Sequence, residues 1–532
     1  MALTTPSASP AVSVREIDLT GVAPNVQTST GAIAGNFKWG PVGQRVLVSS
    51  ETELAATFGT PDEDTAVDFL SAAYFLKYSG SLYVVRSDDN SGDSGSTPGV
   101  NASSIASQGT SIKNAEEWEN VVSTIADGDE FFAKYPGSLG NALGVSVCPA
   151  GAFDTWTHKG LFNSAPTGNE LHIVVKDLTG AISGTAGSVL ELFSYVSTVK
   201  GSKDLQGGSN YAPAVLNKQS AYVWMSEIDA GFAVATEKTF DGGVDTTTPV
   251  HSFDLFADKD TVTIDFLICQ QGQDVNAATA IAEGRKDCVV VASPERDDVV
   301  SNGTATSDIV TWASTLTSSS YTILDCNFFK VYDKYNDKYV YIPSASSTAG
   351  LMAATDKVSA PWFSPAGERR GRYLGITDVA FNPTKSNRDE LYKAGVNPIA
   401  NIPGSGVLLY GDKTFESRPS AFDRINVRRL FLTLERSIEQ AGKNVMFEFN
   451  DEFTRAEFVN IVEPLLREVQ GRRGITEFRV VCDESNNTGA VIDRNEFVAS
   501  IFIKPARSIN YVTLNFVAVR TGVEFEEVTG LV

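Results

Sequence analysis

The clearest periodic pattern of apolar and polar positions lies between residues 424 and 520. Across residues 426–441, apolar side chains recur every three or four positions, which predicts an amphipathic helix with one apolar face. Gly442 follows, where a left-handed C-terminal cap is favoured. Residues 445–449 form a short apolar run. The pattern therefore predicts a helix followed by a short strand.

A second helical pattern covers residues 454–471. Thr454 and Glu457 have the spacing of a capping box, which predicts that this helix begins at Thr454. Its apolar positions again share one face and end at Gly471. Because proline removes a backbone hydrogen bond inside a helix, Pro464 is expected to kink or divide it.

Three further runs in this stretch predict strands. Residues 478–482 alternate between apolar and polar, and residues 483–488 are rich in turn formers. Residues 497–504 and 509–519 predict a pair of strands joined at Pro505. Their apolar positions include Phe497, Ile501, Ile503, Val512, Leu514 and Phe516.

The beginning of the chain combines a lone strand pattern with a compact block. In residues 25–86 strand and helix patterns alternate, which predicts a mixed α/β layer. The predicted strands lie at residues 30–35, 45–48 and 82–85, and the predicted helices at 50–58 and 64–78.

Residues 87–114 are rich in Ser, Gly and Asp and predict a linker or loop where an inserted region begins. From about residue 110 to 345 many short strands follow, which fits several α/β blocks in one domain or two. Residues 345–423 are expected to belong to the same core as residues 25–86. Within the inserted region we expect buried strands at 262–269 and 288–292, a helix at 277–284 between them, and a hairpin from 328–332 and 339–342.

Each end of the chain carries a strand pattern without a sheet beside it. A lone strand is unstable unless it joins a sheet. The N-terminal strand could pair within its own chain, or it could be donated to the sheet of a neighbouring subunit. The apolar positions are Val12, Val14, Ile17 and Leu19 at the N-terminus and Val523, Phe525 and Val528 at the C-terminus.

Length and charge limit the classes of function. A chain of 532 residues is expected to form three or four cores, and its charge of −22 disfavours nucleic-acid binding, which needs basic surfaces. Residues 424–520 hold 14 basic and 13 acidic residues, so the rest of the chain carries −23. This asymmetry predicts a near-neutral or locally basic inner part and an acidic, solvated outer part.

Targeting signals and catalytic motifs are both lacking in the sequence. No signal peptide and no apolar run of about 20 residues occurs, so we expect a cytoplasm-like compartment or a particle assembled there. The three histidines form no HxH or HxxxH pair, and no GxSxG motif occurs. We therefore expect no enzyme, cofactor or metal site. The five cysteines, expected to be buried small hydrophobes, are Cys148, Cys269, Cys288, Cys326 and Cys482.

Ordered motifs along the chain resemble one family. The run Phe-Glu-Phe-Asn-Asp-Glu-Phe-Thr-Arg at 447–455, followed by Val-Cys-Asp-Glu-Ser-Asn-Asn-Thr at 481–488, resembles the C-terminal domain of contractile-tail sheath proteins. The resemblance is closest to the sheaths of T-even-like myophages. Further motifs in the same order lie at residues 39–41, 58–59, 82–86, 135–141, 360–367 and 397–407.

The resemblance implies a multidomain fold of mixed α/β and α+β type. A sheath core of mixed sheet and helices would carry an inserted β-rich outer region and extended terminal arms. The expected parts are an N-terminal arm at 1–24, a core domain from 25–88 and 345–423, an inserted outer region of one or two domains at 89–344, a C-terminal inner domain at 424–520 and a C-terminal arm at 521–532.

The resemblance also implies a structural function without a cofactor. Copies would polymerise as hexameric rings stacked around a tail tube and contract to drive the tube through a host envelope for genome ejection. The expected partners are other copies of the chain, the tail tube protein, and baseplate and tail terminator proteins, with no nucleic acid and no membrane insertion. The expected location is the virion, after assembly in the host cytoplasm. A bacterial contractile injection system, of tailocin or secretion-system type, is the alternative.

Two sets of residues would serve this assembly. The terminal strands would be donated to the C-terminal sheet of neighbours, whose acceptor positions would be Phe497, Ile501, Ile503, Val512, Leu514 and Phe516. Basic residues on the two C-terminal helices either form solvated faces or face an acidic tube through weak, salt-sensitive pairs. The candidates for facing the tube are Arg428, Arg429, Arg436, Lys443, Arg472 and Arg473.

Overall fold

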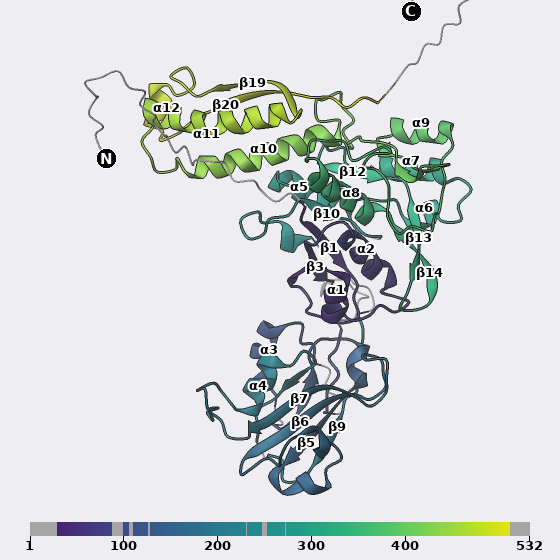
Figure 1. Ribbon diagram of the computed structural model, residues 1–532, viewed down its shortest axis with the longest axis vertical. Helices are drawn as coiled ribbons and strands as arrows, with labels where there is room; N and C mark the ends of the chain where they lie inside the picture. The colour runs from purple at the N-terminus through teal and green to yellow at the C-terminus, as the bar shows by residue number, and fades with distance from the viewer. Residues whose placement is uncertain are drawn as a thin grey trace, which may run out of the picture.

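The computed structural model is elongated, with three bodies arranged along its long axis (Figure 1). It describes residues 29–87, 99–105, 110–125, 128–229, 231–246, 253–271 and 273–510. The two predicted arms, at 12–19 and 523–528, lie outside the described residues. So does the predicted strand at 509–519 from residue 511 onward.

The body in the middle, here called the middle domain, is built on a seven-stranded sheet. Its strand order is β16-β12-β11-β10-β1-β3-β2, and every pair is parallel except β2 with β3. Ile33 of β1 lies between Val84 of β3 and Ile268 of β10. The inner strands β1, β10 and β11 are apolar and buried at every position, as expected of strands covered on both faces. The strands are β1 (Gly31–Gly35), β2 (Arg45–Val48), β3 (Leu82–Arg86), β10 (Phe266–Ile268), β11 (Val289–Ala292), β12 (Thr322–Asp325) and β16 (Val396–Asn397).

Local sequence signals locate the first helix of the middle domain correctly. Ser50 caps it by accepting a hydrogen bond from the backbone N–H of Glu53, and Gly59 follows it at φ 78°. The helices are α1 (Glu51–Phe58), α2 (Ala66–Leu76), α5 (Val275–Arg285), α6 (Arg296–Val299), α7 (Ala305–Ser314), α8 (Ala345–Val358) and α9 (Lys385–Lys393), with a short 3₁₀ helix η4 (Asp254–Phe256).

Smaller antiparallel pairs complete this domain. The predicted hairpin is confirmed as β13 (Phe328–Asp333) and β14 (Lys338–Pro343), and β15 (Asp378–Val379) pairs with the outer side of β13. β17 (Ile399–Ile402) and β18 (Gly406–Leu409) form a second hairpin.

The sheet topology corrects the predicted extent of the inserted region. Residues 262–325 are expected from the sequence within an outer region at 89–344, but β10, β11 and β12 lie in the same sheet as β1. Their side chains belong to one continuous core with those of β1 and β3. Short apolar strands have the same pattern in any sheet, so the sequence did not reveal which sheet they join. Among the described residues, the inserted body is formed by residues 99–246.

This body, here called the insertion domain, is mainly antiparallel. A four-stranded sheet has the order β7-β6-β5-β9, and β4 pairs with β8. Trp39, from the middle-domain segment after β1, packs into its core, with its ring 5.4 Å from that of Tyr135. The elements are α3 (Ala115–Val122), β4 (Phe131–Ala133), η1 (Ser138–Ala142), β5 (Leu143–Pro149), η2 (Ala150–Thr155), η3 (Lys159–Leu161), β6 (Glu170–Asp177), β7 (Ser188–Ser197), α4 (Ala212–Gln219), β8 (Val223–Met225) and β9 (Thr236–Thr239).

The third body, here called the C-terminal domain, is a pair of long helices with a two-stranded sheet. Its sheet lies on α11, which lies against α10 (Figure 1). All five cysteines of the chain are free and buried, as expected. The elements are α10 (Ile425–Lys443), α11 (Glu452–Gly471), β19 (Ile475–Val481), α12 (Gly489–Asp493) and β20 (Ser500–Pro505).

Several local predictions in this domain are wrong in detail. Helix α10 continues through Gly442 to Lys443, and α11 begins two residues early, at Glu452, because Asp451 accepts from the N–H of Thr454. The apolar run at 445–449 forms turns instead of a strand. Pro464 does not divide α11, which is one continuous helix. The apolar faces predict both helices correctly. Only the ends of the helices and the segment that connects them differ from the prediction.

Candidate functional site: the open sheet of the C-terminal domain and the junction beneath it

The strands β19 and β20 form a sheet of only two strands among the described residues. They pair antiparallel, with Phe478 opposite Ile503 and Val480 opposite Ile501. These four side chains are partly buried against the apolar face of α11. The buried residues of that face are Phe458, Val462, Leu466 and Val469. The helix therefore supports one face of the sheet.

Both outer edges of this sheet are unpaired as far as the described residues go. Within the described part of the chain, no other strand pairs with β19 or β20. On the outer face, Phe502 is 60% exposed. A two-stranded sheet is marginally stable, and an unpaired edge is a template for another strand. The geometry thus favours strand addition at this sheet.

The predicted acceptor residues fall partly in this sheet. Ile501 and Ile503 lie on β20, facing α11, and Phe497 precedes the strand with its ring 5.4 Å from that of Phe458. Val512, Leu514 and Phe516 lie outside the described residues, as do all the predicted arm residues. The structure brings Phe497, Ile501 and Ile503 together on one supported face, and their acceptor role stays a prediction.

Helix α10 joins the open sheet to the middle domain. Ile425 and Leu432 belong to the core of the middle domain, whereas Leu430 and Leu434 belong to the core of the C-terminal domain. A single helix with apolar groups in two cores fixes the orientation of one domain on the other. The sheet supported by α11 therefore has a defined position relative to the middle domain.

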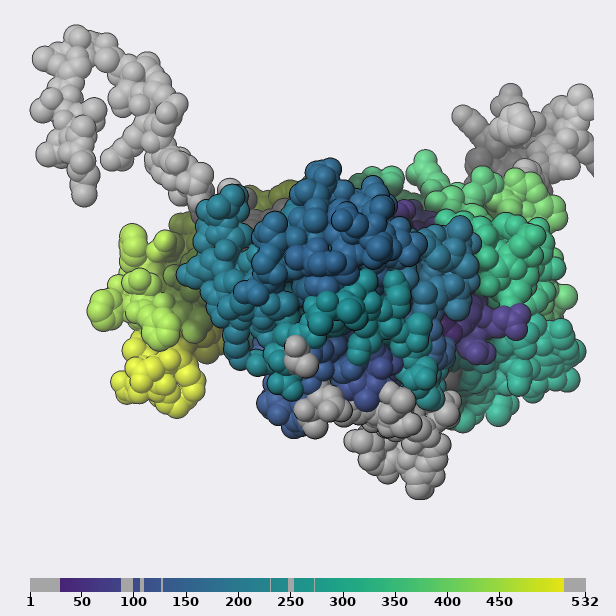
Figure 2. Space-filling view, turned by 90° about the horizontal axis from the view of Figure 1, so that it is seen from below, coloured from purple at the N-terminus to yellow at the C-terminus, as the bar shows by residue number. Residues whose placement is uncertain are grey.

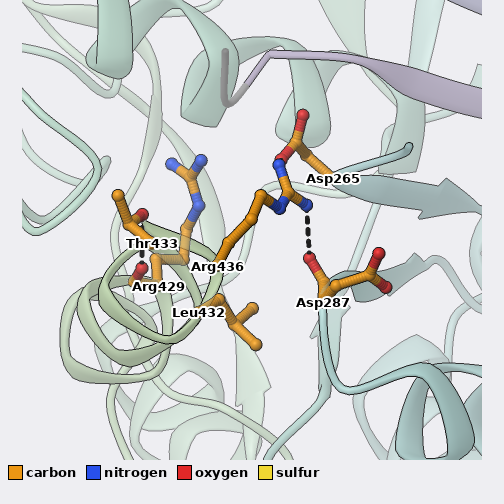
Figure 3. A pocket seen from close by; sticks show the side chains of 6 residues that line it. All are labelled: Asp265, Asp287, Arg429, Leu432, Thr433 and Arg436. Carbon is orange, nitrogen blue, oxygen red and sulfur yellow. Dashed lines mark hydrogen bonds and ion pairs between the residues drawn. The ribbon is translucent and has the colours of Figure 1, made fainter. Parts of the chain in front are cut away.

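A buried ion pair reinforces this junction (Figure 3). The Arg436 guanidinium donates to the Asp265 carboxylate at 2.7 Å, and to the backbone oxygens of Ile264 and Asp287 at 3.0 and 2.8 Å. The other carboxylate oxygen of Asp265 accepts from the backbone N–H of Thr30 at 2.8 Å. Burial raises the pKa of Asp265, and the charge of Arg436 opposes that rise.

Two further arginines of α10 also point into the middle domain. Arg429 binds the Asp356 carboxylate through both of its terminal nitrogens, each at 2.6 Å. Arg428 lies between the rings of Tyr321 and Phe422, 4.2 and 4.0 Å from their centres, and donates to the hydroxyl of Ser320. Such bidentate and stacked arrangements depend on the planarity of the guanidinium.

These contacts divide the candidates for facing the tube into two groups. Arg428 and Arg429 are 6% and 5% exposed, and the guanidinium of Arg436 is occupied at the junction, so these three bind within the chain. Lys443, Arg472 and Arg473 are exposed, and only for them does facing a tube stay a prediction. The sequence did contain a signal that Arg429 and Arg436 bind within the chain, because they lie on the same helical face as the apolar Leu432.

The middle sheet reverses its strand order between β1 and β10, a position where open parallel sheets commonly bind ligands. Here the carboxyl ends of β1 and β3 contact the insertion domain. Arg86, the last residue of β3, donates to the backbone oxygens of Gly40 and Pro136 at 3.1 and 2.8 Å. This edge of the sheet therefore supports the insertion domain.

In the described ranges, no group of three or more His, Cys, Asp or Glu side chains is arranged to hold a metal ion. No helix in those ranges is both long and apolar enough to cross a bilayer.

Family models match three segments of the chain. Residues 28–86 match the tail sheath protein Gp18 domain III N-terminal region, residues 260–415 match the phage tail sheath protein central domain, and residues 417–518 match the phage tail sheath C-terminal domain. The second match begins close to β10, in agreement with the sheet topology.

Curated relatives match nearly the whole chain. The tail sheath protein of Enterobacteria phage T4 is 32% identical, over 98% of this chain and 99% of the relative. The tail sheath protein of a Vibrio phage, KVP40, is 30% identical over the same shares.

Solved structures share the fold at low sequence identity. The sheath tail protein of Desulfitobacterium hafniense superposes with a TM-score of 0.56 at 13% identity, covering 94% of this chain and 100% of that one. The contracted sheath complex of an extracellular contractile injection system, PVC, has a TM-score of 0.53 at 14% identity and covers 98% and 100%.

Proposed function

The chain belongs to the phage tail sheath family, and from this premise we propose that it polymerises as hexameric rings stacked helically around a tail tube. The sheath then shortens and drives the tube through the host envelope for genome ejection. Its partners are other copies of the chain, the tube protein, and baseplate and terminator proteins. It is assembled in the host cytoplasm, works in the virion and has no catalytic role.

The open sheet of β19 and β20 is the observation that carries this proposal. It offers two unpaired edges among the described residues, while the sequence places a lone strand pattern at each end of the chain. Strands donated by neighbours would extend the sheet, with main-chain hydrogen bonds supplying affinity. Each copy would then be connected to its neighbours by chain segments that stay paired while the bodies move.

The junction at α10 suggests how movement is transmitted. Because α10 is shared between two cores and its arginines bind Asp265 and Asp356, the C-terminal domain moves together with the middle domain. Contraction would then be a rigid-body rearrangement of subunits whose sheets remain linked. The driving free energy is the difference in subunit contacts between the extended and contracted lattices.

The alternative is the sheath of a bacterial contractile injection system. One observation favours it, because the contracted sheath of an injection system superposes over 98% of this chain. The phage assignment remains preferred, since the relatives with 30–32% identity over the whole length are phage proteins.

Proline substitutions in the N-terminal arm test the proposal. Val14→Pro and Ile17→Pro remove backbone donors from the strand pattern, whereas Ser7→Pro, outside that pattern, is the matched control. Sheath-like tubes are counted by electron microscopy of the purified full chain. We expect Ser7→Pro to assemble as the unmodified chain does, and the other two variants to form about tenfold fewer tubes, because each loses part of a donated strand. Normal tubes from both arm variants would refute donation by this strand.

A further inference from the structure

An exposed aromatic tip projects from one end of the C-terminal domain. It comprises Met446, Phe447, Phe449 and Phe453, which are 58%, 102%, 84% and 77% exposed. These residues occupy the connection from α10 to α11 and the first turn of α11. In the space-filling view this part of the chain extends past the insertion domain on one side (Figure 2). Clustered exposed hydrophobic groups mark interaction surfaces.

The tip is held in its exposed conformation by the backbone and by one asparagine. Phe447 has φ 71°, a left-handed conformation that is unfavourable for a bulky side chain. Asn450 donates to the backbone oxygen of Glu496 at 2.8 Å and accepts from Arg455 at 2.9 Å. Strained residues persist where the surroundings fix them, and they cluster at functional positions. The aromatic groups are thus presented on a fixed loop.

The charge at this end is acidic. Glu448 and Glu452 are exposed beside the phenylalanines. Neither forms an ion pair with another described residue. The tip therefore combines an apolar centre with unpaired carboxylates, and its complement needs apolar surface with basic groups at the rim.

The opposite end of the same domain, together with the adjoining end of α8 of the middle domain, offers that complement. We call it the basic end, formed by Val358, Arg472, Arg473 and Arg507. Val358 is 80% exposed, and Arg472 donates to the backbone oxygen of the adjacent Ser359 at 2.9 Å. A hydrogen bond from the N–H of Ala506 to the oxygen of Gly474, at 3.0 Å, brings the chain at Arg507 beside Arg473.

The two ends are well separated and differ in charge. Arg473 and Arg507 are exposed, and no described residue forms an ion pair with either. Between the tip and the basic end lies α11, which has 20 residues and is therefore about 30 Å long. One copy cannot bring its own tip to its own basic end. Complementary surfaces at opposite ends of a domain generate a repeating contact between different copies.

We propose that the aromatic tip of one copy docks on the basic end of a second copy. Phe447, Phe449 and Phe453 cover the apolar surface at Val358, while Glu448 and Glu452 face Arg473 and Arg507. The contact is heterologous, so it propagates into a ring or helix. It rests on the proposed function, in which copies assemble, and adds a side-chain contact independent of the donated strands.

A charge exchange tests the pairing of the two ends. Glu448→Lys with Glu452→Lys reverses the tip, and Arg473→Glu with Arg507→Glu reverses the basic end. Assembly of the purified full chain is followed by sedimentation and electron microscopy. Each reversal is expected to raise the concentration needed for assembly about tenfold, because like charges then meet across the contact. The fourfold variant is expected to return to within about threefold of the unmodified chain.

Removal of one aromatic group separates a docking role from a structural role. Phe447→Gly removes a fully exposed side chain and relieves the left-handed backbone. The thermal unfolding temperature of the monomer is therefore expected to stay the same or rise, while assembly weakens about tenfold. Leu205→Gly, at a residue that is also 102% exposed but lies in the insertion domain, is the matched control and should leave assembly unchanged.

The outcomes distinguish this inference from the function on which it rests. If the unmodified chain never assembles, both are overturned. If arm variants fail to assemble but the tip variants assemble normally, the sheath function stands and tip docking is overturned. If basic-end reversal weakens only binding to a tube and tip reversal does not rescue it, the basic end faces the tube instead. Rescue by the fourfold variant supports docking between copies.

Discussion

At the scale of single residues, Asp325 is a fully buried carboxyl group of the middle domain. It ends β12 and accepts hydrogen bonds from the hydroxyls of Ser293, Ser344 and Thr348 at 2.6, 2.6 and 2.7 Å. Burial raises its pKa to about 6, and those hydrogen bonds limit the rise. No cation neutralises it among these partners, so its protonation affects stability directly.

The raised pKa of Asp325 predicts a defined pH dependence. The folded chain binds this proton more tightly than the unfolded chain, whose reference pKa is 3.8. Proton binding by Asp325 therefore contributes its full stabilisation of the folded state below about pH 4, and this stabilisation is lost as the pH rises through 6. Asp325→Asn cannot titrate. Between pH 4 and 7, the free energy of unfolding of the unmodified chain should fall by about 2–3 kcal/mol more than that of the variant.

Urea unfolding at several pH values measures this difference. Parallel pH profiles of the two proteins would contradict the prediction, whatever their absolute stabilities. Because both chains share every other titratable group, the difference isolates Asp325.

At the scale of elements, two helical glycines that look alike in sequence have opposite environments. Gly350 lies within α8, where an added Cβ would be 2.4 Å from Cδ2 of Tyr78, so the helix must approach the end of α2 closely. Gly284 lies in the last turn of α5, where an added Cβ meets nothing within 4 Å. Helix propensity alone favours alanine at both positions.

The same substitution should therefore have opposite effects on stability. Gly350→Ala is expected to lower the free energy of unfolding by about 1–3 kcal/mol, because the Tyr78 ring must shift in a packed core. Gly284→Ala is expected to raise it by about 0.5 kcal/mol through backbone entropy. Thermal and urea unfolding of the two variants provide the measurement, and a rise in the free energy of unfolding for Gly350→Ala as well would show that packing at Tyr78 adapts freely.

At the scale of the whole molecule, the junction beneath the open sheet determines how the domains are held. Arg436→Met removes the cation from Asp265, whose side chain is 7% exposed, and leaves a buried carboxylate unpaired. We expect a loss of about 3–5 kcal/mol in the free energy of unfolding. Lys259→Met breaks an ion pair with Glu439 at the same junction, but those side chains are 42% and 49% exposed, so its cost should be below about 1 kcal/mol.

Urea unfolding measures both costs, and the second variant serves as the control for the first. Equal losses would mean that the buried pair contributes no more than an exposed one. The result also bears on contraction, since a weakened junction would let the C-terminal domain rotate on the middle domain without moving it.

The sequence by itself determined the features that depend on near neighbours. Apolar spacing located α10 and α11, and Ser50 and Gly59 bounded α1 correctly, because helix periodicity and capping act within a few residues. The ordered motifs also determined the family. The alternation of apolar positions also predicted strands at 478–482 and 497–504, where β19 and β20 lie.

Tertiary structure alone decided the features that depend on distant partners. The strands β10 to β12 lie in the same sheet as β1, although the insertion domain separates them in sequence. Arg436 binds Asp265, which is 171 residues away in the sequence. Equally, nothing local distinguishes the exposed Phe447 from a buried phenylalanine. Strand pairing, ion pairing and burial depend on which surfaces meet in space. The sequence pattern shows only the apolar and charged groups that each element carries, and not the partners of those groups.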